Sequence, residues 1–466
     1  MRRRELLGAG LALTVTGKVT PALARGVDTA DVLVAGGGIA GLYAARLLAA
    51  EGARVIVLEA ADEVGGRLKT LDHLPGQPEA GGQTIGGMYA RVLREMGDLG
   101  LGTIPRAGPV PGDAVLAGGA VLSLADWADS PANVLTGEDR AVSPGGLYAR
   151  WLDRANPVAG LEDWQAAEHA GLDAIGVSAL LTGAGASAEA LRLMQHWFDG
   201  PALPAMSALF ACRKRLVERF EAGAALRVKG GSQALPRAMA ARLGDVVRRR
   251  AVVVAMAQDA RGLEMRTADG RRYRGRFGIC ALPFPALRRV RLEPVLPQAL
   301  AAAVARLPYS EIVMVTLRVE RPFWEADGLP PAMYVDGSLQ RVTSAGGQDG
   351  GLPTIACWLR GASAIRAGAM DDATVMAWAM AELGRLRPAC AGALAAGAVT
   401  RWDRTSLGGG AYHYLAPGQS AALFAAMRLP WGRVRFAGEH LADMQQGMEG
   451  ACEAGERAAL QLLEIL

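Results

Sequence analysis

Cysteine, histidine and aromatic residues are all scarce in this chain of 466 residues. The cysteines are odd in number, lie far apart and include no C-x-x-C pair; they are Cys212, Cys280, Cys357, Cys390 and Cys452. We therefore expect small buried side chains and no disulfide framework. The histidines are equally scattered, at His73, His169, His196, His413 and His440. Without a Cys/His cluster, the sequence predicts no metal site.

An excess of charge of either sign is also missing. Charged residues make up 21% of the chain, and the formal net charge is only +4. The first 24 positions hold one acid, Glu5, and four basic residues: Arg2, Arg3, Arg4 and Lys18. The remainder has 46 basic residues against 45 acidic ones. Because no basic stripe interleaved with aromatic residues follows, we expect no nucleic-acid partner.

Apolar residues, in contrast, are abundant. They make up 51% of the chain, which is enough for a large core and argues against disorder. The length exceeds the roughly 250–300 residues at which a single hydrophobic core stops growing, so the sequence predicts two domains. Sixty glycines indicate many tight turns and close backbone approaches.

The first 24 residues have the pattern of an export signal. A positive segment precedes an apolar run from Leu6 to Thr16 and the A-x-A cleavage pattern Ala22-Leu23-Ala24. The apolar run is shorter than the ~20 residues that span a hydrocarbon core. The paired arginines before Glu5-Leu6-Leu7 resemble the twin-arginine pattern R-R-x-[FL]-L.

The export machinery that reads this pattern carries folded proteins. We therefore predict twin-arginine export to the periplasm or the medium, with no stable membrane span after cleavage. Folding in a reducing cytoplasm also agrees with the absence of paired cysteines. An ordinary secretory signal or an uncleaved anchor is the alternative.

A dinucleotide-binding motif opens the mature chain. The buried-strand pattern Asp31–Val34 leads into a glycine-rich turn, 35–41, and then a helical stretch from Leu42 to Ala50. A second strand pattern runs from Arg54 to Leu58. This is the strand–turn–helix–strand context that G-x-G-x-x-G requires, so the sequence predicts a dinucleotide site here.

Each glycine of the motif has a physical task. Gly36 permits the tight turn, Gly38 lets the backbone approach a pyrophosphate, and Gly41 lets the helix pack against the strand. The first helical turn, with Ile39 and Ala40, offers unpaired N–H groups and a positive dipole end to that anion.

Glu59 ends the second strand, 18 positions after the last glycine of the motif. Its carboxylate is placed to accept hydrogen bonds from a ribose 2′-hydroxyl, and a negative charge there disfavours the 2′-phosphate of NADP. FAD and NAD both remain open from this motif alone.

The segment after Glu59 favours FAD. Ala60 leads through a short acidic stretch into Gly65-Gly66-Arg67, which resembles the second FAD fingerprint of the flavin amine oxidases. The resemblance implies that Arg67 contacts the pyrophosphate, where its guanidinium would supply charge-assisted donors. NAD-dependent dehydrogenases do not need this element.

Two further blocks extend the resemblance over nearly all of the mature chain. One is the G-G turn in 79–86 with the helix after it; the other is Gly438-Glu439-His440 with the helix that follows Gly447. The resemblance implies that the second helix points its N-terminus at the flavin ring, where N–H groups stabilise negative charge. The implied cofactor contacts are Ala60, Gly65, Gly66, Arg67, Gly81, Gly82, Gln83, Thr84, Val252, Gly438, Glu439, Gly447 and Met448, beside Gly36, Gly38, Ile39, Ala40, Gly41 and Glu59.

These blocks predict an α/β, two-domain flavoprotein, with a Rossmann-like FAD/NAD(P)-binding domain interleaved with an α+β substrate domain. The FAD-binding domain takes 30–101, 228–290 and 401–466. The substrate domain takes 102–227, which is mostly helical, and 291–400, a sheet with helices. Val252, in the β-branched run 251–254, aligns with a valine whose backbone faces the cofactor in the family.

The chemistry of the family is a hydride transfer from the carbon next to a neutral amine to flavin N5. In the block from Trp402 to Tyr412, the resemblance implies that Tyr412 forms one wall of an aromatic cage, and Trp402 is a second candidate for the site. In the monoamine oxidases a cysteine before that tyrosine binds the flavin covalently. Ala411 stands here, so we expect non-covalent FAD.

Three positions depart from the family pattern. Gly447 stands where the second cage aromatic is usual, and Met314 where a lysine is usually bound through water to N5. Thr84 stands where L-amino-acid oxidases carry an arginine for the substrate carboxylate, although Arg192 or Arg213 could supply that charge. We therefore name no catalytic base and expect an amine without an α-carboxylate.

The predicted function is that of an FAD-dependent amine oxidase. It oxidises a primary or secondary amine to an imine and then an aldehyde, with O2 or another electron acceptor as the partner that takes the electrons. An L-amino-acid oxidase and a desaturase-like flavoprotein are the enzymatic alternatives. A redox-inert flavin-binding partner protein is the non-enzymatic one, prompted by Met314 and Gly447.

Overall fold

A computed structural model of the chain describes residues 27–105, 112–198, 200–220, 225–346 and 351–466. The predicted export signal, 1–24, lies outside these residues. In the described part, no helix has the length and apolar character needed to cross a membrane.

The first of two large sheets is built from strands at both ends and the middle of the chain. Its order is β11-β8-β9-β10-β1-β2-β7, and β17 also pairs with β10. The strands are β1 (Asp28–Ala35), β2 (Val55–Leu58), β7 (Val247–Arg248), β8 (Val253–Asp259), β9 (Gly262–Thr267), β10 (Arg272–Cys280), β11 (Arg291–Glu293) and β17 (Val434–Phe436). β9 and β10 form an antiparallel hairpin around Asp269-Gly270.

The centre of this sheet is parallel. β1 runs parallel to β2 on one side and to β10 on the other, and β17 runs parallel to β10. Strands buried on both faces read as continuous apolar runs, which explains the pattern of β1 and β2. The carboxyl ends of β1, β2 and β17 therefore meet at one edge of the sheet.

The second sheet has seven strands in the order β16-β12-β15-β14-β13-β4-β5. They are β4 (Ala114–Ala117), β5 (Ala120–Leu122), β12 (Ile312–Val319), β13 (Met333–Val335), β14 (Arg341–Ala345), β15 (Thr354–Arg360) and β16 (Leu394–Trp402). A short third sheet pairs β3 (Thr103–Pro105) with β6 (Leu226–Val228).

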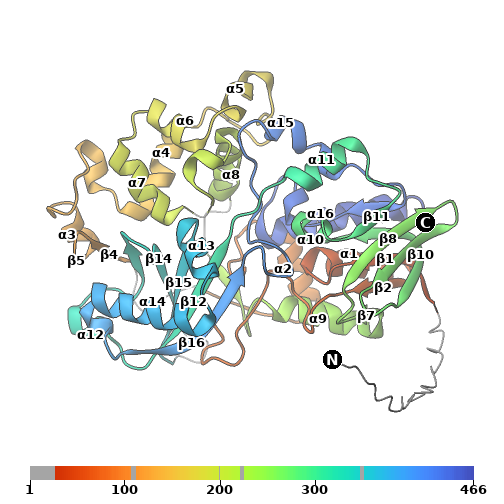
Figure 1. Cartoon of the computed structure of the whole chain (residues 1–466), viewed down its shortest axis with the longest axis horizontal. Coiled ribbons are helices and arrows are strands. Elements are labelled where there is room, and N and C mark those ends of the chain that lie inside the picture. Colours follow the sequence, from red (N-terminus) through yellow and green to blue (C-terminus); the bar gives the residue numbers. More distant parts are fainter. Residues whose placement is uncertain (1–26, 106–111, 199, 221–224, 347–350) are drawn as a thin grey trace, which may run out of the picture.

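The helices form three groups (Figure 1). Around the first sheet lie α1 (Ile39–Ala50), α2 (Ala90–Asp98), α9 (Ala234–Leu243), α10 (Phe284–Leu287), α11 (Gln298–Arg306) and α16 (Gly447–Leu463). Beside the second sheet lie α12 (Trp324–Asp327), α13 (Ala362–Gly368) and α14 (Asp372–Leu386). A helical cluster at the upper left comprises α4 (Leu147–Ala155), α5 (Ala170–Asp173), α6 (Val177–Gly183), α7 (Ala188–Trp197) and α8 (Ala208–Phe220), with α3 (Leu124–Trp127) at its edge. The short helix α15 (Ser420–Leu423) lies at the top, between α5 and α11.

The core follows the same division. Central strands β1 and β2 pack against α1 and α16 in one apolar cluster, while β12, β15 and α14 share another. A further cluster joins the helical group to the far side of the first sheet. The architecture is the expected α/β fold, in which segments of the second sheet and the helical group interrupt the first sheet in sequence.

Candidate active site

The N-terminus of α1 lies at the carboxyl end of β1, with Gly38 as its N-cap and no side chain capping it. A Cβ atom on Gly41 would stand 2.1 Å from the Gly36 carbonyl oxygen, so only glycine permits this packing of helix against turn. In front of Gly38 the space is open, with no atom within 4 Å of a Cβ position. An uncapped helix N-terminus with room in front fits a pyrophosphate.

Glu59 is fixed by the backbone around that turn. One carboxylate oxygen accepts the Gly37 N–H at 2.7 Å, and the other accepts the Ala61 N–H at 2.8 Å. Burial raises the pKa of Glu59, and the backbone hydrogen bonds oppose that rise. Each carboxylate oxygen has a second lone pair, so Glu59 keeps the capacity to accept a ribose hydroxyl.

Sequence reasoning missed Gly37. A Cβ atom there would stand 2.9 Å from both Cβ and Oε2 of Glu59, so a side chain at this position would displace the acid. The glycine run Gly36-Gly37-Gly38 carried the signal, but the spacing rule uses only its first and third members.

The second glycine turn lies directly against the first. Gly65 donates its N–H to the Gly37 carbonyl at 2.9 Å and forms an isolated bridge with Gly38. The predicted contacts Gly65 and Gly66 are thus brought to the N-terminus of α1, and the buried Ile39 and Ala40 form its first turn. The two fingerprints form one continuous surface.

Arg67 connects this surface to the C-terminal part of the chain. Its Nη1 donates to the Ala411 carbonyl at 2.7 Å and lies 3.4 Å from Oε2 of Glu439. The expected partner was a phosphate, whereas two protein groups share Nη1. Because a guanidinium has five N–H donors, these contacts orient the side chain and leave others for an anion.

The predicted flavin-side turn pairs with the segment around Arg67. The Gly82 N–H donates to the Arg67 carbonyl at 3.0 Å, and the Ala80 N–H donates to the Lys69 carbonyl at 2.8 Å. Gly81, Gln83 and Thr84 are half-buried beside them. This pairing carries 81–84 to the same region as the second fingerprint.

Val252 lies immediately before strand β8. β8 begins at Val253, and Val252 is 37% exposed just before it. Its neighbour Ala251 donates its N–H to the Glu59 carbonyl at 2.7 Å. The Val252 carbonyl also accepts the Ala268 N–H at 2.8 Å, which continues the pairing of β8 with β9. The predicted contact therefore lies beside Glu59 and Ala60.

At the end of β17, Glu439 is held between His413 and Arg67. His413 Nδ1 lies 3.2 Å from Oε2 of Glu439, and Arg67 contacts the same oxygen. Burial alone would raise the pKa of Glu439, but the charges of His413, Arg67 and Lys214 hold it well below its usual range. Glu439 is therefore a carboxylate at neutral pH.

The helix α16 starts at Gly447, with the buried Met448 in its first turn. The carboxylate of Glu449 accepts the N–H groups of Arg91 and Val92 at 3.1 and 3.0 Å, which ties α16 to the start of α2. The sequence analysis did not predict that Glu449 would hold the start of α2, since nothing local in the sequence pairs the two.

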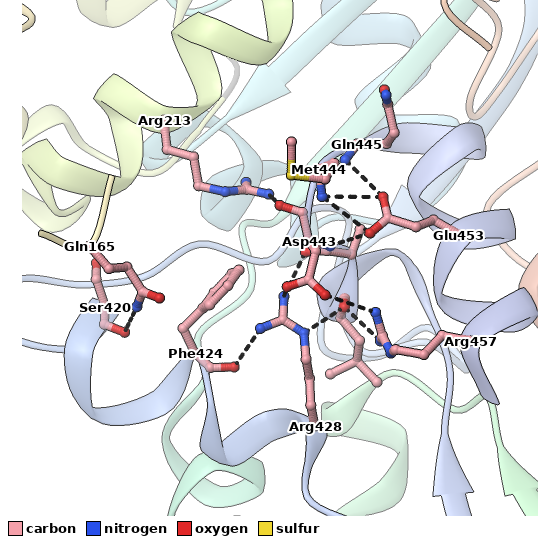
Figure 2. Close-up of polar contacts among 12 residues, drawn as sticks. Gln165, Arg213, Ser420, Phe424, Arg428, Asp443, Met444, Gln445, Glu453 and Arg457 are labelled. Carbon is pink, nitrogen blue, oxygen red and sulfur yellow. Dashed lines mark hydrogen bonds and ion pairs between the residues drawn. The ribbon is translucent and has the colours of Figure 1, made fainter. Parts of the chain in front are cut away.

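The loop before α16 is fixed by charged side chains (Figure 2). Glu453 accepts the N–H groups of Asp443, Met444 and Gln445 at 2.6–3.2 Å. Arg428 and Arg457 pair with the Asp443 carboxylate at 2.7 and 3.3 Å. The position of the α16 N-terminus is therefore set by this network.

Arg213 joins the same loop from α8. Its Nη2 donates to the Asp443 carbonyl at 2.6 Å (Figure 2). Its guanidinium lies 5.5 and 5.4 Å from the ring centroids of Trp164 and Phe424. Arg192 is paired with Glu189 and Asp336 at 2.8 and 2.5 Å. Both arginines considered for a substrate carboxylate thus have protein partners.

Trp402 packs in the same cluster as Ala411, and Tyr412 follows Ala411 in the chain. The Trp402 indole N–H donates to the Ala80 carbonyl at 2.6 Å, and its ring packs in a small cluster with Met314 and Ala411. Tyr412 is 38% exposed, and its carbonyl accepts the Ser310 N–H at 2.7 Å. The structure therefore brings both residues to the region of Arg67, with Tyr412 the more open to solvent.

Comparisons with known proteins match nearly the whole chain. The model of the flavin containing amine oxidoreductase family matches residues 39–463. Amine oxidase [flavin-containing] B of Bos taurus is 26% identical, over 94% of this chain and 86% of its own length. L-amino acid dehydrogenase of Synechocystis sp. is 25% identical, over 94% of this chain and 96% of its own length.

Among solved structures, cyclohexylamine oxidase from Brevibacterium oxydans has a similar fold. It superposes with a TM-score of 0.77 at 24% identity, covering 93% of this chain and 99% of that one. The agreement in fold extends over both large sheets and the helical group.

Proposed function

The chain belongs to the family of flavin-containing amine oxidoreductases, and we propose that it oxidises primary or secondary amines without an α-carboxylate, using non-covalent FAD. It is an FAD-dependent amine oxidase by family. The observation that carries the finer proposal is the contact of Arg67 with Ala411 and Glu439, which joins the cofactor motifs to the block that holds Tyr412.

The residues present fit FAD. The open space before Gly38 suits a pyrophosphate, Glu59 suits a ribose, and the N-terminus of α16 suits the flavin ring. When bound, FAD supplies the two-electron acceptor for the oxidation. The protein's own task is to hold the amine and exclude water, for which we propose Tyr412 and Trp402 as walls of the pocket.

Non-covalent binding is supported by the residue before Tyr412. Ala411 has no nucleophilic atom, and its carbonyl is engaged by Arg67. The five cysteines are buried, and burial raises the pKa of four of them to about 12, so these stay as thiols at neutral pH. A thiol is a poor nucleophile compared with a thiolate.

The choice of amine rests on charge. Thr84 offers no cation, Arg192 is saturated by two carboxylates, and Arg213 is buried between aromatic rings. A buried carboxylate needs a paired cation. The relatives named as amine and cyclohexylamine oxidases support this choice, while the similarity to an L-amino acid dehydrogenase keeps amino acids as the second candidate.

We further propose the domain division inferred from the sequence, with 30–101, 228–290 and 401–466 as the FAD-binding domain. The membership of β1, β2, β8 and β10 in one sheet supports it, and β11 (Arg291–Glu293) extends that sheet just past the boundary at 290. Twin-arginine export to the periplasm or medium is proposed from the sequence alone, because cofactor loading would precede transport.

A substrate panel tests the proposal. The purified protein is assayed with monoamines, diamines, secondary amines and L-amino acids, using peroxide and artificial dye as parallel readouts. We expect turnover with amines and little with amino acids, and release of intact FAD on acid precipitation. Turnover of amino acids alone would favour the second candidate, an enzyme that oxidises amino acids. Flavin retained in the protein pellet would contradict non-covalent binding.

A further inference from the structure

The loop before α16 is held by side chains rather than by strand or helix pairing (Figure 2). Glu453, on the second turn of α16, accepts the N–H groups of residues 443–445 at 2.6–3.2 Å. In the described part of the chain, none of these N–H groups donates to a backbone carbonyl. On the carbonyl side of the loop, Arg428 donates to Leu441 and Ala442 at 2.9 and 2.8 Å.

The first turn of α16 is weak by its own sequence. Two of its residues, Gly447 and Gly450, are glycines, and the N-cap residue Gln446 makes no side-chain cap. Glycine loses more conformational freedom than other residues when it enters a helix, and an uncapped helix end leaves its first N–H groups without partners. The turn therefore depends on contacts from outside the helix.

The loop supplies such a contact because it lies directly on this turn. A Cβ atom on Gly450 would stand 2.9 Å from the Cβ of Ala442 and 3.1 Å from the carbonyl oxygen of Gln445, so only glycine permits this packing. Ala442 is buried there. Glu453 binds the loop from the next turn of the same helix, so its carboxylate clamps the loop against the first turn.

The first turn of α16 has a fixed place relative to the cofactor motifs. α16 crosses the first turn of α1 at Gly455, where a Cβ atom would stand 2.5 Å from the Ala40 carbonyl oxygen. Gly447 lies eight residues earlier, which is about 12 Å along the helix axis. α16 therefore connects the turn proposed for the pyrophosphate with its own N-terminus, which is proposed for the flavin ring.

We propose that Glu453 is a positioning residue that sets the reduction potential of bound FAD. By binding the loop, Glu453 keeps the first turn of α16 formed. The N–H groups of that turn then stabilise the negative charge that the flavin ring gains on reduction. Glu453 acts through the loop and not by contact with the cofactor. This inference deepens the proposed function and rests on it.

The charge of Glu453 and its positioning role act on the potential in opposite directions. A nearby carboxylate disfavours added negative charge, so its neutralisation would by charge alone raise the potential. Loss of an ordered first turn removes N–H groups that stabilise the reduced ring, which lowers the potential. The sign of the shift therefore distinguishes positioning from a simple charge effect.

The variant Glu453→Gln tests the inference, because a glutamine has one acceptor oxygen where the carboxylate has two. We expect the ratio of reduced to oxidised flavin at a fixed potential to fall about tenfold in the holoenzyme. For a two-electron couple, that change lowers the midpoint potential by about 30 mV. The potential is measured with a chemical reductant and a reference dye, so no amine is needed. Hydrogen exchange in the peptide 441–450 should become at least about tenfold faster.

Glu456→Gln is the matched control, because it removes the same charge from the next turn of α16. The Glu456 carboxylate pairs with Arg91 at 2.7 Å, and in the described part of the chain it accepts no N–H group of the loop. We expect its potential to stay as in wild type or to rise, with hydrogen exchange unchanged. Asp443→Asn releases Arg428 and Arg457 from the same loop. It is the second variant if Glu453→Gln does not retain FAD, and it should lower the potential as well.

The outcomes separate this inference from the proposed function. A potential that is unchanged or higher in Glu453→Gln, or an equal fall in Glu456→Gln, would overturn the inference and leave the proposed function intact. If Asp443→Asn has to replace the first variant, an unchanged or higher potential in it counts in the same way. Wild-type protein that binds no flavin would overturn the proposed function, and the inference with it.

Discussion

The hydroxyl oxygen of Tyr89 lies 2.9 Å from the point where a Cβ atom on Gly447 would stand. Gly447 begins α16 with a φ of +58°, and Tyr89 is the buried N-cap residue of α2. The position at which the family usually has a second cage aromatic is therefore closed here by backbone conformation and by the neighbouring hydroxyl. Restoring the family residue would not simply restore the family pocket.

Gly447→Tyr should destabilise the protein by about 1–3 kcal/mol, because a side chain is strained at positive φ and its Cβ meets the Tyr89 hydroxyl. Urea unfolding measures the change. In the double variant, Tyr89→Ala should recover only the part of the lost stability that is due to the clash. Tyr89→Ala alone completes the double-mutant cycle. A fully stable single variant would show that the loop before α16 shifts freely, despite the network around Glu453.

Met314→Lys should change the reaction of reduced flavin with O2. Met314 is 1% exposed in a cluster with Ile312 and Trp358, so burial will lower the pKa of the new amine. In its protonated form the lysine stabilises negative charge that develops on oxygen, and a tenfold faster reoxidation corresponds to about 1.4 kcal/mol. Stopped-flow reoxidation at low and high pH measures this.

Met314→Leu is the control for that variant, because it conserves volume and adds no charge. FAD content should be unchanged in both. Identical reoxidation rates for wild type and Met314→Lys would mean that position 314 does not face the flavin.

Gly38→Val should fold and yet fail to hold FAD. The φ and ψ of Gly38 are −73° and 172°, which any residue adopts, and no atom lies within 4 Å of the new Cβ. The side chain would occupy only the space assigned to the pyrophosphate. The flavin-to-protein ratio and the thermal midpoint of the apoprotein are the measurements, with Gly87→Val as control at another glycine with open space around it. Full flavin loading of Gly38→Val would place the cofactor elsewhere.

Glu79 should make stability depend on pH. It is buried, accepts hydrogen bonds from Thr70 Oγ1 and the Ser232 N–H, and burial raises its pKa to about 7. A raised pKa means that the folded state binds a proton more tightly. Glu79 therefore stabilises the folded state fully below pH 4–5, and this stabilisation is lost as pH rises through about 7.

Glu79→Gln removes that titration. We expect the free energy of unfolding of the variant, relative to that of wild type, to rise by on the order of 2–3 kcal/mol between pH 5 and pH 8. Each pKa unit is worth about 1.36 kcal/mol. Denaturant unfolding of both proteins at several pH values measures the gain. A constant difference between them would show that the carboxyl group has an ordinary pKa.

Short sequence motifs were sufficient to predict the parts of the site that come from one stretch of the chain. The turn at Gly36–Gly41 and the acid at Glu59 follow from short segments with fixed spacing, and the α/β fold expected from them is confirmed. Arg67 and Ala411, in contrast, are 344 residues apart in sequence, and only the tertiary fold brings them into contact. The hydrogen bond from Arg213 to Asp443 likewise depends on where α8 packs, which no periodicity specifies.

The central claim is that this chain holds FAD so that an amine reduces it. The most direct test is an anaerobic titration of the purified holoenzyme with the best amine from the panel, followed by the visible absorbance of the flavin. The account predicts complete bleaching with one equivalent of amine per flavin, and return of the absorbance on adding an electron acceptor. Flavin that stays oxidised with every amine, while remaining fully bound, would contradict it.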